Sequence, residues 1–340
     1  MFHPPCEPDR WQTGLVIVVA SPGQGSQTPG FLAPWLELDG VADQLAAYSD
    51  AAEVDLIAHG TESDADTIRD TRIAQPLIVA ASLIAADELT RRAGRTADGV
   101  AGHSVGELAA LVGAQVVAAH DAMRLVGIRG RAMADAAAHT PTGMSAVLGG
   151  DADEVIALLD ELELTPANYN VAGQIVAAGA LPALAQLAER APRGVRVMPL
   201  QVAGAFHTSY MAPAVDTLRA AVSGVSAADP ALTLWSNRDG AAVTDGHDAL
   251  ERIVSQVSSP VRWDLCMHSF AEAGVTGFIE VAPAGALVGL AKRGLRGVPN
   301  VAVKTPDDLD AAVELLSSAG HSDQAESSER AEPSERSESQ

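Results

Sequence analysis

The chain has 340 residues, 47% of them hydrophobic, and a formal net charge of -22 from 44 acidic and 22 basic residues. This length can bury a sizeable core, but the acidic balance argues against a general binder of nucleic acid or anionic membranes, because phosphate neutralisation needs clustered Lys and Arg. Aromatic residues make up only 4% of the chain, which disfavours stacking on nucleic acid bases. We therefore expect a globular protein that binds neither nucleic acid nor membrane.

The two ends of the chain differ in composition from the rest. Residues 1–13 hold three prolines, mixed charge and no hydrophobic periodicity, and we expect a flexible extension. Residues 318–340 consist mainly of Ser, Glu, Arg and Gln, and predict a disordered acidic tail. The apolar stretch 15–20 is too short for a signal peptide, and the chain has only two cysteines, Cys6 and Cys266. A cytoplasmic location is therefore expected.

Strand and helix patterns alternate from residue 15 onward. Residues 15–20 form a continuous apolar run rich in valine, which is typical of a strand covered on both faces. Helical spacing follows at 73–89, a short strand at 99–102 and an Ala-rich helix at 107–119. The longest apolar run, 108–119, lies in this last helix and is too short to span a membrane. Such alternation predicts a parallel sheet with helices on both faces.

The middle of the chain has a different pattern, β-α-β-β-α-β, which is that of a ferredoxin-like unit. Its strands and helices are expected at 144–148, 151–162, 166–170, 174–178, 181–191 and 195–200, with Asp151 as the N-cap of the first helix. Further strands at 232–237 and 277–281 return to the larger sheet. The predicted fold class is α/β, with a large α/β-hydrolase-like domain over 14–140 and 204–317 and a small inserted ferredoxin-like domain over 141–203.

The sharpest chemical signal is the sequence Gly-His-Ser-Val-Gly at residues 102–106. It fits the G-x-S-x-G nucleophile elbow, since it follows a predicted strand and precedes a predicted helix. Glycines permit a tight turn on which Ser104 stands exposed at a helix N-terminus, where N–H groups favour developing negative charge. Ser104 is therefore the candidate nucleophile.

A second glycine-containing loop, Gly-Gln-Gly-Ser-Gln at residues 23–27, follows the first predicted strand. Its N–H groups can point at an anion. A dinucleotide-binding fingerprint is disfavoured because Thr28 occupies the place of the third glycine. The alternative is a plain turn between strand and helix.

Together the two motifs resemble the malonyl-CoA:acyl carrier protein transacylases and the related acyltransferase domains of polyketide synthases. The resemblance runs from about residue 14 to 300, with its landmarks in order: residues 23–27, residues 102–107, Arg129, His207 and Gln256, the last before a Pro-Val-Arg-Trp segment. It implies malonyl transfer from malonyl-CoA to the carrier thiol through an ester on Ser104, without a cofactor, in fatty acid synthesis.

The resemblance also implies roles for individual residues. His207 matches the general base of a Ser–His dyad in which main-chain carbonyls replace the carboxylate of a triad. Gln256 is expected to orient His207 or the neighbouring loop through its side-chain amide. The backbone N–H groups of Gln24 and Val105 are the expected oxyanion donors.

The acyl group is expected to be held by Arg129, which matches the family arginine that grips the free carboxylate of malonyl. Arg124, about one turn away, is its rival. Phe206 precedes the histidine, as in polyketide relatives that take malonyl in place of methylmalonyl. His103 is expected to pack at the elbow. Asn168 and Asn170 match a segment that lines the cleft.

The expected partner is an acidic acyl carrier protein, with Lys292, Arg293 and Arg296 as its docking cluster and Arg91, Arg92 and Arg95 as a second cluster. Scattered histidines and unpaired cysteines predict no metal site. Three alternatives stay open. They are an acyltransferase that serves a polyketide synthase, a serine thioesterase or esterase, and an acyl-thioester binding protein without activity.

Overall fold

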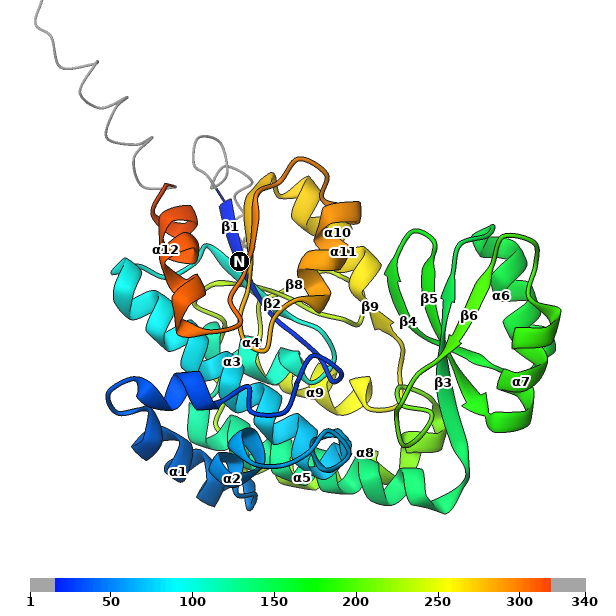
Figure 1. The fold of residues 1–340 in the computed structure, drawn as a ribbon, viewed down its shortest axis with the longest axis horizontal. Coiled ribbons are helices and arrows are strands. Elements are labelled where there is room, and N and C mark those ends of the chain that lie inside the picture. Colours follow the sequence, from blue (N-terminus) through cyan, green and yellow to red (C-terminus); the bar gives the residue numbers. More distant parts are fainter. Residues whose placement is uncertain (1–15, 319–340) are drawn as a thin grey trace, which may run out of the picture.

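The computed structural model describes residues 16–318, arranged as two units that lie side by side in Figure 1. The larger unit holds a six-stranded sheet with helices around it. The smaller unit is a five-stranded sheet with two helices on one face, green in the figure except for one yellow strand. The predictions for residues 1–13 and 319–340 lie outside the described residues. Ser318, predicted to begin the tail, is instead the last residue of helix α12 (Leu309–Ser318).

The larger sheet has the strand order β11-β10-β1-β2-β7-β8. Every neighbouring pair is parallel except β7 and β8, which confirms the parallel sheet that the alternating pattern predicted. The strands are β1 (Val16–Ser21), β2 (Gly99–Gly102), β7 (Thr233–Trp235), β8 (Ala242–Val243), β10 (Val275–Glu280) and β11 (Asn300–Ala302).

Strand β1 is buried on both faces, as its unbroken apolar sequence predicts. Ile17 and Val19 belong to a core formed with α3, α4 and α5, whereas Val16 and Val18 pack in a separate core with α10 and α11. The sheet therefore separates two hydrophobic cores. The centre of the sheet is held rigidly from both sides, which fixes the position of the loops that follow its strands.

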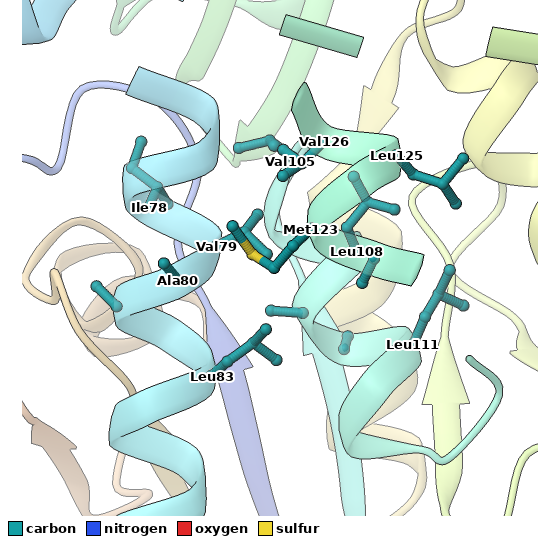
Figure 2. Packing of buried hydrophobic residues seen from close by; sticks show 14 of the residues in the cluster. Ile78, Val79, Ala80, Leu83, Val105, Leu108, Leu111, Met123, Leu125 and Val126 are labelled. Atoms are coloured by element: carbon teal, nitrogen blue, oxygen red, sulfur yellow. The ribbon is translucent and has the colours of Figure 1, made fainter. Parts of the chain in front are cut away.

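Three helices form the core behind the elbow: α3 (Thr71–Ala93), α4 (Gly106–Gly113) and α5 (Ala119–His139). Figure 2 shows that Val79 and Leu83 of α3 point toward Leu108 of α4 and Met123 of α5. Helix α3 is long and apolar enough to cross a membrane by composition, yet 72% of that stretch is buried inside the protein. This burial is what a core helix shows.

The helix predicted over 107–119 is shorter than expected, since α4 ends at Gly113. Gln115 takes a left-handed conformation with φ of 61°, which is incompatible with a continuing right-handed helix. The chain turns there and begins α5 at Ala119. The apolar run was misread as one helix because the turn after α4 also carries buried apolar residues, Ala114, Val116 and Val117.

The smaller sheet has the order β6-β3-β5-β4-β9. Its first four strands and two helices follow the predicted chain order: β3 (Thr142–Leu148), α6 (Ala152–Glu161), β4 (Thr165–Val171), β5 (Gln174–Ala180), α7 (Leu181–Arg190) and β6 (Arg196–Pro199). Asp151 caps α6 by accepting hydrogen bonds from the N–H groups of Asp153 and Glu154, as predicted. The fifth strand, β9 (Val261–Arg262), was not predicted and comes from far along the chain.

The remaining helices surround the larger sheet. They are α1 (Val41–Ala52), α2 (Leu56–Thr61), α8 (Ala212–Val222), α9 (Gly246–Gln256), α10 (Trp263–Glu272), α11 (Ala286–Gly294) and α12, with short 3₁₀ turns at Ala33–Glu37, Thr67–Arg69, Ser209–Met211 and Pro306–Asp308. Two of them matter for the site. Helix α9 ends at Gln256, and α11 lines the cavity described below.

Candidate active site

The two glycine-containing loops lie side by side because they follow neighbouring parallel strands. Ser21 at the end of β1 pairs with Gly102 at the end of β2. The N–H of His103 then donates to the carbonyl oxygen of Ser21 at 2.9 Å. The carboxyl ends of parallel strands are where ligands bind in open α/β sheets. The arrangement therefore brings residues 23–27 and Ser104 to the same edge of the sheet.

The turn at Ser104 is sharp enough to exclude side chains at both flanking glycines. A Cβ on Gly102 would lie 2.0 Å from the backbone of Gly106, and one on Gly106 would lie 2.2 Å from the carbonyl oxygen of Ser21. Ser104 itself has φ of 52°, a conformation that costs about 1–3 kcal/mol for a residue with a side chain. This local strain is what a nucleophile elbow requires.

His207 reaches this turn from a loop one hundred residues downstream. Its Nε2 lies 2.7 Å from the Oγ of Ser104. His207 also has a left-handed backbone, with φ of 61°, and its side chain is buried. The proposed nucleophile and base are therefore within hydrogen-bond reach in the free protein.

The tautomer of His207 follows from its second hydrogen bond. Nδ1 lies 2.8 Å from the main-chain carbonyl oxygen of Gln256, which can only accept, so the proton is on Nδ1 and Nε2 is free to accept from Ser104. Burial, together with the positive charge of Arg129, lowers the pKa of His207 to about 3 against the opposing effect of that carbonyl. His207 is consequently neutral at physiological pH, as a general base must be.

Arg129 lies on α5 and is 1% exposed. Its two terminal nitrogens donate to the side-chain oxygens of Gln75 at 2.7 Å and Gln256 at 2.8 Å, and its Nε has no partner. Burial lowers the pKa of Arg129 to about 10, which still leaves it charged at neutral pH. The rival Arg124 is partly exposed and lies near Asp121, so Arg129 is the buried cation of the site.

The side-chain amide of Gln256 bonds the neighbouring loop, which was one of its two expected partners, and not the imidazole of His207. Its main-chain carbonyl holds His207, while its side-chain Nε2 donates to the carbonyl oxygen of Ser104 at 3.0 Å and to Glu107. The amide thus orients the elbow and Arg129, and the backbone orients the base. One residue at the end of α9 connects all three groups.

Two buried residues of the site had been given no role from sequence. Asn237, fully buried just after β7, accepts from the N–H of Ser104 at 2.7 Å and donates to the carbonyl oxygen of Gly102 at 2.7 Å, so its amide spans the elbow. Glu107, in the first turn of α4, accepts from the N–H of Asn237 at 2.6 Å. The only available signal for Asn237 was a polar residue at the end of a predicted strand.

A cavity of about 520 Å³ opens beside the Ser104 hydroxyl, between the two sheets. Its walls include residues 23–25 of the first loop, Phe206 and His207, Met144 and Val176 of the smaller sheet, and Leu290 of α11. Within the described chain the N–H groups of Gln24 and Val105 donate no backbone hydrogen bond. The volume lies in the range of small-molecule binding sites.

His103 packs at the elbow as expected. Its Nε2 lies 2.9 Å from the side-chain oxygen of Asn170, and its ring meets Trp263 edge-on with centroids 5.7 Å apart. Burial lowers the pKa of His103, so it is neutral as well. Asn168 and Asn170 both line the cavity. His103 therefore joins the elbow to the smaller sheet.

Comparison with known proteins places this site in a family. A family described as the acyl transferase domain matches residues 19–323. The chain belongs to this acyl transferase family. It is 56% identical over 303 residues to the malonyl CoA-acyl carrier protein transacylase of Mycobacterium tuberculosis, covering 88% of this chain and 100% of that protein. The Escherichia coli K12 protein of the same name is 32% identical, covering 86% of this chain and 97% of its own.

Solved structures agree. The crystal structure of MCAT from Mycobacterium tuberculosis superposes with a TM-score of 0.85, covering 88% of this chain and 99% of that one at 56% identity. A type II PKS acyl-carrier protein in complex with its malonyl-transacylase contains a chain that superposes with a TM-score of 0.83 at 30% identity, covering 88% of this chain and 99% of that one. The mixed α/β fold with a parallel sheet is thus shared with acyl transferases.

The two basic clusters of this acyl transferase differ in their surroundings. Arg91 and Arg92 are ion-paired with Glu88, and Arg95 is ion-paired with Asp98. In the other cluster, Arg293 contacts the side chain of Gln174 across the cavity rim, and Lys292 and Arg296 are exposed without an ion pair among residues 16–318. Only this second cluster combines free charge with a position beside the cavity. Over the same residues, no group of three or more His, Cys, Asp or Glu could hold a metal.

Proposed function

We propose that this acyl transferase moves malonyl from coenzyme A to the thiol of an acyl carrier protein through an ester on Ser104. The observation that carries the proposal is the pairing of Ser104 Oγ with a neutral His207 at 2.7 Å beside the cavity. One wall residue of that cavity, Gln75, accepts a hydrogen bond from the buried Arg129. The names of its relatives point to the same activity. No cofactor is needed, because the thioester is already an activated acyl group.

In the first half-reaction, Ser104 Oγ attacks the thioester carbonyl while His207 Nε2 takes the hydroxyl proton. The negative charge that develops on the carbonyl oxygen is stabilised by the N–H groups of Gln24 and Val105. When the C–S bond breaks, the coenzyme A sulfur takes the proton from His207. In the second half-reaction the carrier thiol gives its proton to His207, attacks the ester, and Ser104 recovers its proton.

Selection for malonyl follows from the buried guanidinium of Arg129. A carboxylate can accept two parallel hydrogen bonds from its terminal nitrogens. An acetyl group offers no carboxylate, and thus leaves the cation without a charged partner in a buried site. The ring of Phe206, in the cavity wall, takes up the space that the extra methyl of methylmalonyl would need.

The domain division proposed from sequence places the small unit at 141–203 as a ferredoxin-like insertion in an α/β-hydrolase-like domain over 14–140 and 204–317. The antiparallel strand order β6-β3-β5-β4, in which each helix connects two strands separated by one other strand, supports the insertion. Strand β9, from residues 261–262, extends the small sheet beyond that division. The active site then lies where the insertion meets the larger domain.

The carrier protein is proposed to dock at Lys292, Arg293 and Arg296. These residues are at the end of α11 and just beyond it, and Arg293 lines the cavity. An acidic carrier and an enzyme of net charge -22 repel each other over distance, so a local basic patch is needed to steer approach. We propose a cytoplasmic enzyme that supplies fatty acid synthesis.

A role with a polyketide carrier is the second candidate, since one superposing relative was solved with a type II PKS acyl-carrier protein. A thioesterase is disfavoured because a buried Arg129 has no use in general ester hydrolysis. A protein without activity is disfavoured by the Ser104–His207 hydrogen bond.

The deciding experiment incubates the protein separately with malonyl-CoA, methylmalonyl-CoA and acetyl-CoA and locates any adduct by mass spectrometry. We expect a malonyl ester on Ser104, little methylmalonyl or acetyl ester, and no adduct in Ser104→Ala. Addition of an acyl carrier protein with its pantetheine arm should then discharge the ester to the carrier thiol. Release of free malonate in place of acyl carrier would make the protein a thioesterase.

A further inference from the structure

The side-chain amide of Gln256 stands between a cation and an anion, both buried. Its Oε1 accepts from Arg129 at 2.8 Å, and its Nε2 donates to Glu107, to the carbonyl oxygen of Ser104 at 3.0 Å and, at 3.3 Å, toward the side-chain oxygen of Asn237. Every neighbour of the nitrogen is an acceptor and the neighbour of the oxygen is a donor. The amide therefore has one allowed orientation.

Glu107 is the carboxyl group of that set. Burial raises its pKa to about 7, so it is ionised above neutral pH. It is 4% exposed, its other oxygen accepts from the N–H of Asn237 at 2.6 Å, and the basic side chain whose charge acts on it is Arg129. An ionised carboxylate can only accept hydrogen bonds, whereas an amide in its place must present a donor on one side. Both terminal atoms of the side chain at position 107 must therefore accept hydrogen bonds.

We propose that Glu107 is a positioning residue for acyl selection: through Gln256 it holds the guanidinium of Arg129 in the orientation that grips the carboxylate of the acyl group. The charge of Glu107 also offsets that of Arg129 across the amide, so the cation can stay buried in the free enzyme. This inference rests on the proposed function, in which Arg129 selects malonyl.

Replacing Glu107 by glutamine keeps the size of the side chain but replaces one of its two acceptor oxygens by an NH2 donor. If the new oxygen still accepts from the N–H of Asn237, the new NH2 faces the NH2 of Gln256. If Gln256 rotates to avoid this, its NH2 faces Arg129 and its oxygen faces the carbonyl oxygen of Ser104. Each arrangement places donor against donor or acceptor against acceptor. The simplest relief is displacement of Arg129.

The hydrogen bond of His207 goes to the main-chain oxygen of Gln256 and does not involve the amide that changes. The elbow also keeps its two hydrogen bonds to the side chain of Asn237. The variant should therefore change the selection of the acyl group and leave the reactivity of Ser104 nearly unchanged. A role of Glu107 in general scaffolding would move both together.

The test measures, for Glu107→Gln, the rates of Ser104 acylation by malonyl-CoA and acetyl-CoA and the rate of labelling by a fluorophosphonate probe. The probe uses Ser104, His207 and the oxyanion donors but has no carboxylate for Arg129 to bind. We expect the malonyl-to-acetyl ratio to fall by roughly tenfold or more while probe labelling stays within about threefold. Glu107→Asp, which keeps an acceptor-only side chain, should recover part of the ratio. Glu88→Gln, at a largely buried glutamate remote from the cavity, is the matched control and should leave all three rates unchanged.

The outcomes separate this inference from the function on which it rests. An unchanged ratio in Glu107→Gln, an equal fall of both acylation rates and probe labelling, or a raised ratio caused by loss of a repelling charge would each overturn the role of Glu107. Arg129→Ala is run alongside. If that variant loses the malonyl preference and Glu107→Gln keeps it, only the inference fails. If Arg129→Ala also keeps the preference, the proposed carboxylate grip fails.

Discussion

At the scale of single residues, the site depends on groups that are buried and yet ready to change their hydrogen bonds. Ser104 and His207 both adopt left-handed backbone conformations, and Arg129 has an unpaired Nε in the interior. Such features cost stability and are maintained by the surrounding structure. Here Asn237 and Gln256 supply that support, since their amides bridge the elbow from both sides.

The neutral state of His207 has a consequence for stability against acid. Its pKa is about 3 when folded, against an ordinary value near 6.5, so between these pH values the unfolded chain binds a proton that the folded protein does not. The free energy of unfolding should therefore fall as pH drops below 6.5. The contribution of this one group is at most about 1.4 kcal/mol per pH unit.

The measurement compares urea unfolding of the parent and His207→Gln between pH 4 and 6.5. We expect the stability of the variant relative to the parent to rise as pH falls, because the variant lacks the slope that His207 contributes. Glu107, whose pKa burial raises to about 7, acts with the opposite sign, so the difference between variant and parent is the informative quantity. His268→Gln, at an exposed histidine beside Glu272, should retain the parent slope. Identical slopes in parent and His207→Gln would mean that His207 is charged when folded.

At the scale of elements, helix α11 connects the cavity to the docking cluster, and a buried carboxylate fixes its start. Glu280, at the end of β10 and fully buried, accepts from the N–H groups of Gly285, Leu287 and Val288 at 2.8 to 2.9 Å. The first N–H groups of a helix have no acceptor within the helix itself. Gly285, at the N-cap, has no side chain to accept from them, so Glu280 takes that place. The first turn of α11 lines the cavity, so Glu280 sets one of its walls.

Replacing Glu280 by glutamine should disturb this wall, because an amide NH2 would face N–H donors. We expect the free energy of unfolding to fall by about 1–3 kcal/mol, with a raised KM for malonyl-CoA. Urea unfolding and initial rates measure the two effects. Glu251→Gln, at an exposed glutamate paired with Arg219, serves as the control. Parental stability in the Glu280→Gln variant would show that the helix start is held by other contacts.

At the scale of the whole molecule, the site forms where two sheets of different architecture meet. The larger sheet contributes the elbow and first loop, and the smaller sheet contributes cavity residues such as Met144 and Val176. Strand β9 pairs with β4 and thereby ties the smaller sheet to the segment directly after Gln256 (Figure 1). The width of the cavity therefore depends on how the two units are joined.

The proposed docking of an acidic carrier protein depends on the charge of the surface around Lys292, Arg293 and Arg296. The double reversal Lys292→Glu and Arg296→Glu should raise the carrier KM by roughly tenfold with little change in kcat, and should weaken the dependence of kcat/KM on salt. Steady-state kinetics at low and physiological ionic strength test this. The matched control reverses Arg91 and Arg92, which lie at the end of α3 far from the cavity. Equal effects of both double variants would point to net charge and not to a docking site.

Local sequence was enough to predict much of this protein. The unbroken apolar run of β1, the alternating elements and the elbow glycines are short-range patterns, since burial and backbone geometry restrict the residues that fit them. Ser104, the candidate loop at 23–27 and the order of the small unit could all be derived in this way. His207, Arg129 and Gln256 were expected only through family resemblance, because one histidine among nine carries no local signal.

Only the tertiary structure decided which distant groups meet. The bonds from Ser104 to Asn237, from Glu107 to Gln256 and from Arg129 to Gln75 join residues more than fifty positions apart. It also decided that the backbone of Gln256, not its amide, holds His207, and that the run 108–119 breaks at Gly113. The physical reason is that hydrogen-bond partners and burial are set by the packing of elements in space, which local spacing along a chain does not encode.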